Sequence, residues 1–267
     1  MAGSELECVV RGGVALVGRL EGEVAFAFTE RAGGVSEPPF SSLNLGAHVG
    51  DDPAAVEENR RRALAAMGAE DLLSRLLTAN QVHGDNVVTV ADASAHALAE
   101  ARSELARGAD AVVCTAPDVP VMLLFADCTP VVLTAPGGFA VAHSGWRGTY
   151  AGIAGKAARL LARAIGCETA AIRAFIGPHI LGDEYEVSAD LLAKFSLRFD
   201  NISIAEPAML DMSAAIRSSL EEAGVPPCAI HDSHLSTMRQ NDRFFSYRAE
   251  RGTCGRHAAI AFMRRAR

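Results

Sequence analysis

The chain has 267 residues, of which 49% are hydrophobic and 21% charged, and its formal net charge is −7 at pH 7. This balance supplies ample material for a buried core, and the excess of acidic groups argues against a nucleic-acid partner, whose phosphate backbone favours a basic protein face. A local pocket can still attract a small anion. The opening residues do not read as a leader peptide and no run of 18 apolar residues occurs, so we expect no membrane partner.

The cysteines stand singly and do not form a paired motif. They are Cys8, Cys114, Cys128, Cys167, Cys228 and Cys254. Without a CxxC pair, the sequence contains neither a zinc ribbon nor a thioredoxin motif. Free thiols fit a reducing compartment, and we therefore expect a cytoplasmic protein.

The N-terminal part is predicted to combine a long loop with short regular elements. Residues 1–23 are Gly-rich and weakly patterned, and we expect a hairpin or a loose start without a role there. The apolar run 24–29 predicts a strand, and residues 30–52 predict a long loop, a kind of segment that is often functional. A helix follows over 53–67, because Asp52 suits its capping position and proline suits its first residue.

The next segment is predicted to contain strands buried in a core. In chain order we expect a short helix or turn at 70–80, a strand at 87–90, a loop and helix at 91–108, and strands at 109–114 and 119–125. The last two runs are nearly continuous in apolar residues, which is typical of strands covered on both faces. We therefore interpret Cys114, inside one of these runs, as a core residue.

Residues 125–150 are the stretch around which the chain is expected to be organised. A strand ends at the polar corner Asp127-Cys128, a second strand runs to a Pro-Gly-Gly turn, and a third strand ends at His143. A Gly-rich bend then leads into a helix. The pattern thus places a thiol and an imidazole near strand ends, beside the start of a helix.

The C-terminal part mixes strands and helices without strict alternation. We expect helices over 152–165, within 185–199 and over 211–223, and strands at 171–176, 229–230, 244–247 and 258–263. Neither an internal repeat nor a linker is visible. The prediction from the pattern alone is therefore one α/β domain with mixed sheets over residues 1–267, rather than a doubly wound sheet.

Three residues, His83, Cys128 and His143, have side chains suited to chemistry, although 45 and 15 positions separate them. Two imidazoles and a thiolate are a normal ligand set for Zn²⁺ or copper with one open position. The same groups serve a thiolate nucleophile with imidazole bases. The spacing also allows a plain alternative, with Cys128 as a small buried residue and both histidines as hydrogen-bonded turn residues.

Several motifs in a fixed order identify a resemblance that covers about residues 24 to 263. They are GGVSEPPFSSLNLGAHVGDDP, QVHG, ADCTPVVL, AHSGWRGTYAGI and RFFSYR. Together they resemble the polyphenol oxidase/laccase-domain family, also described as purine nucleoside phosphorylases and a peptidoglycan-editing factor. The resemblance implies an α+β sandwich of two mixed sheets between helix layers (α/β/β/α), like the catalytic domain of cytotoxic necrotizing factor. It also implies that His83, Cys128 and His143 form a metal-binding or catalytic triplet.

The activities that the resemblance implies are phosphorolysis of adenosine, inosine and methylthioadenosine, and deamination of adenosine. The expected partners are therefore a purine nucleoside and phosphate. Phosphate is expected at the Gly-rich bend 144–149, where a helix start favours anions and Arg147 adds donors. Arg31 is a second anion candidate, and Asn44 and Gln81 are further candidates for substrate binding. The alternative makes the glycines turn residues and Arg147 a surface ion-pair partner.

Deamination needs an activated water, which a Zn²⁺ ion on the triplet would supply. Asp127, next to Cys128, is a candidate general acid/base or a partner for a histidine, although it also suits a strand-end capping role. A multicopper laccase needs many histidines, often in His-x-His pairs. This chain has eight histidines and no such pair.

Alternative functions remain compatible with the same residues. A single copper ion on the triplet would fit a simple polyphenol oxidase, so zinc is the expected metal and copper its alternative. An amidohydrolase that acts on a cell-wall precursor and a zinc-stabilised binding protein are the other two. The sequence does not indicate an oligomeric state.

Overall fold

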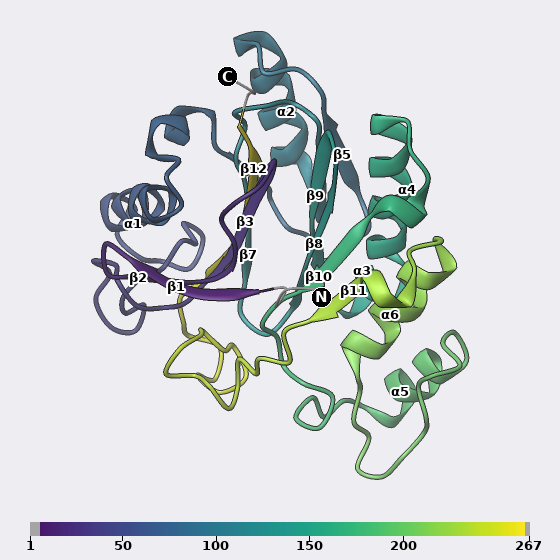
Figure 1. Cartoon of the computed structure of the whole chain (residues 1–267). Helices are drawn as coiled ribbons and strands as arrows, with labels where there is room; N and C mark the ends of the chain where they lie inside the picture. The colour runs from purple at the N-terminus through teal and green to yellow at the C-terminus, as the bar shows by residue number, and fades with distance from the viewer. Residues whose placement is uncertain (1–5, 265–267) are drawn as a thin grey trace.

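Two six-stranded β-sheets face each other in the computed structural model, which describes residues 6–264, and helices cover their outer faces (Figure 1). This arrangement confirms the expected α+β sandwich of two mixed sheets between helix layers. Within the described residues, no helix combines the length and the apolar character that crossing a bilayer requires.

The first sheet joins the two ends of the described chain. Its strands, in spatial order, are β1 (Glu7–Arg11), β2 (Val14–Arg19), β3 (Val24–Thr29), β12 (His257–Met263), β7 (Val121–Phe125) and β4 (Leu77–Thr78). All neighbours are antiparallel except β4 and β7, which are parallel. The weakly patterned N-terminal segment therefore contains a hairpin, β1–β2, at one edge of this sheet. Residues 1–5 of that segment lie outside the described part.

The second sheet carries the stretch that the sequence marked as central. Its spatial order is β11 (Ile230–Asp232), β10 (Arg173–Ile176), β8 (Thr129–Ala135), β9 (Gly138–Ser144), β6 (Ala111–Cys114) and β5 (Val87–Val90). The two outermost pairs are parallel and the inner pairs antiparallel. Strands β8 and β9 form a hairpin whose turn contains Gly137 at φ +86°, a conformation that glycine adopts without steric cost.

The helices cover three sides of the sandwich. They are α1 (Pro53–Ala66), α2 (Ala95–Arg107), α3 (Trp146–Tyr150), α4 (Ile153–Ile165), α5 (Ala189–Ser196) and α6 (Met212–Glu222), with 3₁₀ turns at Glu70–Arg75, Thr169–Ala171 and Pro227–Ala229. Helix α1 packs on the outer face of the first sheet, and α4 and α6 pack on that of the second. Helix α2 lies across the edge strands β4 and β5 and closes the gap between the sheets.

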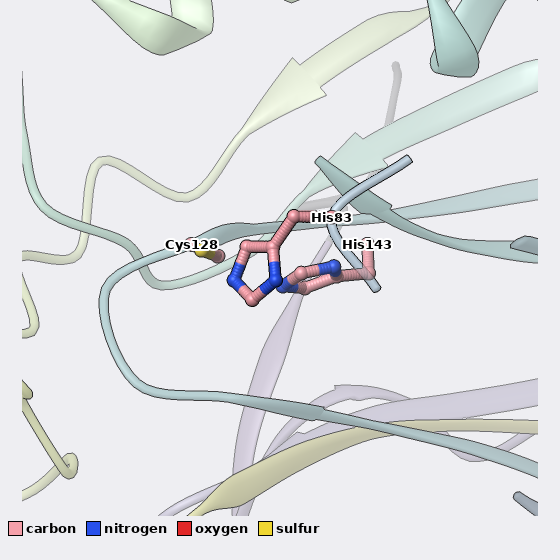
Figure 2. A group of neighbouring side chains, drawn as sticks. All are labelled: His83, Cys128 and His143. Carbon is pink, nitrogen blue, oxygen red and sulfur yellow. The ribbon is translucent and has the colours of Figure 1, made fainter. Parts of the chain in front are cut away.

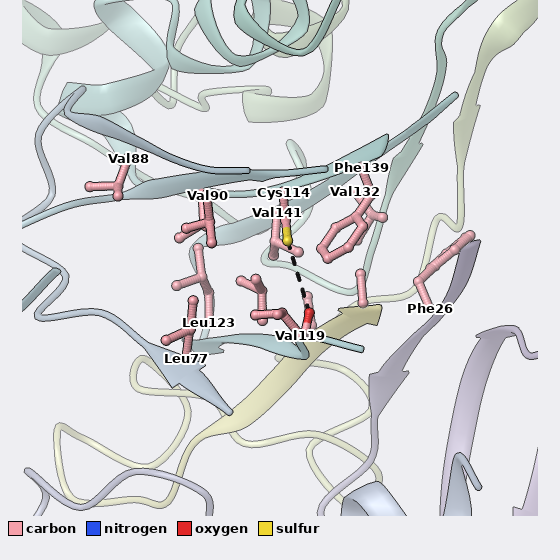
Figure 3. Packing of buried hydrophobic residues seen from close by; sticks show 14 of the residues in the cluster. Phe26, Leu77, Val88, Val90, Cys114, Val119, Leu123, Val132, Phe139 and Val141 are labelled. Atoms are coloured by element: carbon pink, nitrogen blue, oxygen red, sulfur yellow. Dashed lines mark hydrogen bonds between the residues drawn. The ribbon is translucent and has the colours of Figure 1, made fainter. Parts of the chain in front are cut away.

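Apolar side chains from both sheets fill the space between them (Figure 3). Strands β6 and β7 are buried at every position, as the continuous apolar runs predicted. Cys114 has no exposed surface, and burial raises the pKa of its thiol to about 12. It is therefore a core residue, in agreement with the sequence interpretation.

The strand expected at 244–247 was a wrong prediction, because this segment is irregular, with a bend at Phe244 and a turn that begins at Tyr247. Phe244 and Phe245 are both fully buried, and the Phe244 backbone binds the Gln240 carbonyl oxygen and the Asn241 side chain rather than a neighbouring strand. The Glu250 carboxylate accepts hydrogen bonds from the Ser246 backbone N–H, at 3.1 Å, and from the Asn241 amide, at 2.9 Å. An aromatic run indicates burial here but not an extended backbone.

His257, at the start of β12, is a fully buried histidine outside the expected triplet. Its ring stacks on Phe125 at 6.3 Å between centroids and meets Phe244 edge-on at 5.6 Å. Burial lowers the pKa of His257 to about 3, and the positive charges of Arg256 and Arg31 add to this effect. The folded protein therefore holds this imidazole in its neutral form.

We expect His257 to make the protein less stable as the pH falls. Below its ordinary pKa near 6.5 the unfolded chain binds a proton that the folded chain refuses, so the free energy of unfolding falls by up to ~1.4 kcal/mol per pH unit until about pH 3. Chemical denaturation between pH 7 and pH 4.5 measures how the free energy of unfolding depends on pH. The slope of this dependence should be shallower for His257→Gln than for the wild type. His96→Gln is the control, since the His96 side chain is 85% exposed. Equal slopes for all three proteins would contradict this assignment.

Candidate metal and substrate site

The side chains of His83, Cys128 and His143 lie together, and their ligand atoms are all within 4.8 Å of one another (Figure 2). Cys128 directly precedes β8, whose pairing with β9 sets Pro130 opposite His143. His83 comes from the loop before β5 and has φ +59°. The His83 and His143 rings stand nearly perpendicular, at 81°, with centroids 4.8 Å apart. Among residues 6–264, this is the one group of three or more His, Cys, Asp or Glu side chains with metal-site geometry.

The carboxylate of Asp110 holds two members of this cluster in place. Asp110 is fully buried immediately before β6, and its Oδ1 lies 2.8 Å from Nδ1 of His143. The same carboxylate accepts backbone N–H groups from His83 at 2.9 Å, Gly84 at 2.7 Å and Val82 at 3.2 Å. A carboxylate on Nδ1 fixes the ring orientation and leaves Nε2 as the ligand atom.

Asp110 was not identified from the sequence, although a signal was present. It is the only charged residue in the apolar run 109–114, where the pattern indicated a buried strand. A carboxylate at the head of a buried strand needs several donors, because burial without partners is costly. That requirement was the available hint of a polar network.

Gly145 provides the space in which the cluster assembles. A Cβ atom at this position would lie 2.9 Å from Cδ2 of His83 and 3.4 Å from Sγ of Cys128. Gly148 similarly lets α3 approach the His83 loop, since a Cβ there would lie 2.6 Å from the Gly84 carbonyl oxygen. The close approach of these backbones explains both glycines of the bend.

The cluster is electrostatically polarised. Burial alone would raise the pKa of Cys128, but the positive charge of His143 and polar contacts with both imidazoles lower it to about 6. Burial would lower the pKa of His143, but Cys128 and Asp110 together raise it to about 9. Each group therefore favours the charged form of the other, a thiolate beside an imidazolium. A thiolate and imidazole nitrogens are suitable ligands for Zn²⁺ or copper, so the donor set fits a single metal ion.

The cluster forms part of the wall of a cavity of about 1000 Å³. Gln81 lines this cavity, but its amide group is bound to the Leu124 backbone, donating to the carbonyl oxygen at 2.7 Å and accepting from the N–H at 2.8 Å. Gln81 thus ties the His83 loop to β7. The aromatic rings of Phe125, Tyr185 and Tyr247 also face the cavity.

Asp127 lies in the cavity wall with φ +83°. Its carboxylate binds residues of the C-terminal loop rather than the histidines. Its Oδ1 accepts a hydrogen bond from Thr237 Oγ1 at 2.7 Å, and its Oδ2 accepts one from the Arg248 N–H at 2.7 Å. Asp127 therefore fastens the C-terminal loop to the corner that carries Cys128. The carboxylate that contacts His143 belongs to Asp110.

The expected substrate-binding residues Asn44, Arg31 and Arg147 are outside the set of described residues that line the cavity. Asn44 is fully buried, and its side chain binds Gly46, Asp51 and the Arg256 N–H. Its contacts shape the long loop.

The two arginines are engaged elsewhere. Arg31 pairs with Glu250 at 3.2 Å and lies over the Phe245 ring at 4.4 Å. Arg147 is exposed on α3, a helix of five residues, and lies over the Trp146 ring at 4.5 Å. The arginines in the cavity wall are instead Arg60, Arg102, Arg248 and Arg256.

The fold and the site define the class of this protein as a two-sheet sandwich with one His/Cys/His cluster on a cavity wall. Similarity to known proteins shows its family. The family model of the multi-copper polyphenol oxidoreductase laccase matches residues 25–264. The chain therefore belongs to this family, as the resemblance in its motifs indicated. The cluster nevertheless provides ligands for one metal ion rather than several.

Relatives with similar sequences bear the name purine nucleoside phosphorylase. SCO2081 of Streptomyces coelicolor is 37% identical over 252 residues, covering 89% of this chain and 95% of the relative. The protein of Deinococcus radiodurans is 38% identical over 243 residues, covering 89% and 88%. These relatives support an enzymatic role for the chain.

Solved structures agree with this fold over almost the whole chain. YlmD of Geobacillus stearothermophilus superposes with a TM-score of 0.86 at 32% identity, covering 98% of this chain and 99% of that one. YfiH of Bacillus licheniformis superposes with a TM-score of 0.83 at 30% identity, covering 97% and 99%. The sandwich described above is thus the fold of the family.

We expect Asp110→Asn to weaken metal binding. An amide can replace only one carboxylate oxygen, and its NH₂ group would face the backbone donors of the His83 loop, so both histidines lose their fixed positions. Zn²⁺ affinity should fall by roughly 10- to 100-fold, as for other partners of metal-binding histidines. Competition with a chelating dye measures this affinity.

Asp85→Asn is the matched control for Asp110→Asn. Asp85 lies on the same loop, but its side chain is 49% exposed and pairs with Lys156 at 2.9 Å. It should keep wild-type affinity. A folded Asp110→Asn protein that binds Zn²⁺ as tightly as the wild type would contradict the role given to this carboxylate.

Proposed function

We propose that this protein is a purine nucleoside phosphorylase that acts on adenosine, inosine and methylthioadenosine and that also deaminates adenosine. The observation that carries the proposal is the meeting of His83, Cys128 and His143 on the wall of one cavity, in a chain related over most of its length to proteins with the phosphorylase name. All six cysteines are free thiols, which supports the expected cytoplasmic location.

The cavity suits a nucleoside in size and in the character of its wall. A volume of about 1000 Å³ is at the upper end of the range found for small-molecule sites. Tyr185 and Tyr247 offer aromatic faces against which a purine ring can pack. Arg248 lies over the Tyr185 ring at 5.5 Å, so this part of the wall combines an apolar surface with donors for hydroxyl groups.

Phosphorolysis transfers the ribosyl group from the base to phosphate. A phosphate oxygen bonds to C1′ while the C1′–N9 bond breaks. The electron pair of the C1′–N9 bond stays with the purine, which takes up a proton. Ribose 1-phosphate and the free base leave. In our proposal the nucleoside binds beside His83 and His143 at this wall, and Asp110 keeps the His143 ring from turning.

The same three residues would hold the metal, with zinc as the expected ion and copper as the alternative. Such an ion supplies a Lewis acid and lowers the pKa of a bound water, which is the chemistry that deamination at C6 requires. His143 would bind through Nε2, since Asp110 occupies its Nδ1 side. Metal analysis of the purified protein distinguishes zinc from copper.

A second candidate function rests on the spatial arrangement of Cys128, His143 and Asp110. The Cys128 thiolate contacts the His143 imidazole, and the imidazole contacts the buried Asp110 carboxylate. These contacts form the arrangement of a nucleophile, its base and the group that orients the base. In an amidohydrolase acting on a cell-wall precursor, Sγ would attack the amide carbon and His143 would protonate the departing amine. Water would then hydrolyse the thioester.

We expect purified protein to release hypoxanthine from inosine only when phosphate is present, with ribose 1-phosphate as the second product. Cys128→Ala should lower kcat/KM by at least ~100-fold, because it removes a charged group that touches both imidazoles. Cys228→Ala is the matched control, since this thiol is exposed. Liquid chromatography of the bases and nucleosides measures both phosphorolysis and the conversion of adenosine to inosine.

Two results would decide against the phosphorylase. The first is base release that is absent, or independent of phosphate, for all three nucleosides. The second is full activity in Cys128→Ala. Release of an amino acid from a muropeptide precursor, lost in Cys128→Ala and unaffected by phosphate, would favour the amidohydrolase instead.

A further inference from the structure

The cavity wall carries basic side chains, and two of them, both arginines, form no ion pair within the described residues. Arg60, Arg256 and His48 all line it. Among the residues that the structure describes, no Asp or Glu oxygen lies within 4.0 Å of either guanidinium group. Other arginines of the long loop and α1 behave differently, since Arg31 and Arg61 both form ion pairs. Arg60 and Arg256 therefore bring positive charge without an ion-pair partner to the cavity wall.

Backbone carbonyl groups fix the positions of these two guanidinium groups. Arg60 donates from Nε and Nη2 to the Leu45 carbonyl oxygen, at 3.0 and 2.9 Å. Arg256 donates from Nη1 to the carbonyl oxygens of Gly255 at 2.8 Å and Cys254 at 2.9 Å. A guanidinium has five N–H donors, so each group is oriented by some and keeps others for a ligand.

The environment of these side chains favours an anion. Both arginines are half-buried, and burial lowers the pKa of Arg60, an effect that the negative charge of Glu57 partly offsets. Burial also lowers the pKa of His48, and the charges of Arg256 and Arg60 lower it further. Like charges held together in a partly dry wall repel one another. A bound anion would relieve that repulsion and accept the remaining N–H donors.

Phe125 links the strand that follows Arg256 to the His/Cys/His cluster. Arg256 directly precedes His257, which pairs with Phe125 across β12 and β7. The Phe125 ring packs against His257 at 6.3 Å and against His143 at 5.4 Å between centroids. Phe125 also lines the cavity, so both groups of residues border the same space.

We propose that Arg60 and Arg256, with His48 beside them, form an oxyanion subsite that binds inorganic phosphate as the co-substrate. The proposal rests on the proposed function, which requires a phosphate dianion in the same cavity as the nucleoside. Arginine suits this ligand because its planar fork of donors matches phosphate oxygens. The Gly-rich bend with Arg147, where the sequence had suggested phosphate, lies outside the cavity-lining residues.

Kinetics of Arg60→Gln and Arg256→Gln test the subsite. Loss of one charge-assisted contact should raise the KM for phosphate roughly tenfold or more, while the KM for inosine changes less than about twofold. Arg60→Lys and Arg256→Lys keep the charge and should recover part of the phosphate affinity. Melting temperatures show which variants are folded, and only folded variants are compared.

Arg61→Gln is the matched control. Arg61 is the neighbour of Arg60 on α1, but it pairs with Glu58 and Glu70 and lies outside the cavity wall. Its KM for phosphate should equal that of the wild type. Unchanged phosphate KM in both folded Gln variants, or an equal rise in the Arg61→Gln control, would overturn the subsite.

Calorimetric titration with inorganic phosphate, without any nucleoside, separates this proposal from the phosphorylase itself. Binding to the wild type that weakens at least ~tenfold in the two Gln variants supports the subsite even when no phosphorolysis is detected. A second titration with inosine 5′-monophosphate distinguishes free phosphate from a phosphate ester. Variants that lose affinity for the nucleotide but bind inorganic phosphate as the wild type does would overturn the proposal.

Discussion

The buried carboxylate of Asp110 is the interaction on which the whole site depends. It receives three consecutive backbone N–H groups, from residues 82–84, and one imidazole N–H, from His143. A carboxylate without exposed surface is tolerated only with such a set of donors. In return it holds His83 at a positive φ, which is costly for a residue with a side chain. One charge thereby couples a loop, a strand and two potential metal ligands.

The topology of the sandwich determines which residues can meet at this carboxylate. In the second sheet the neighbours β8, β9, β6 and β5 bring Cys128, His143, Asp110 and the loop with His83 to one end. The first sheet adds β7 and β12, which carry Phe125 and the approach to Arg256. The cavity is therefore built by both sheets, although each contributes a different chemistry.

The residue pattern predicted most regular elements and the resemblance to the family implied the triplet, but neither indicated the network that supports them. Apolar periodicity is a local property, so most strands and helices were identified, whereas the aromatic run 244–247 indicated burial and was wrongly taken for a strand. The partner of His143 was sought in Asp127 because it adjoins Cys128. The actual contact joins residues 33 positions apart, and only the pairing of β6 with β9 creates it. The Gly-rich bend likewise indicated an anion site. The structure gives Gly145 another role, since a side chain there would collide with the His83 ring.

Local charge, rather than the net charge of −7, governs what this cavity can bind. The charge of the Cys128 thiolate is offset by the neighbouring His143 imidazolium, whereas Arg60 and Arg256 form no ion pair, so an anion in the cavity would be drawn to the arginine side of Phe125. A divalent metal ion on the triplet would add positive charge there, because it would replace the His143 proton and carry twice the charge of that proton. Metal loading would therefore change where along the cavity an anion is most stable. The same residues that hold the ion would thus help to set the position of phosphate relative to the nucleoside.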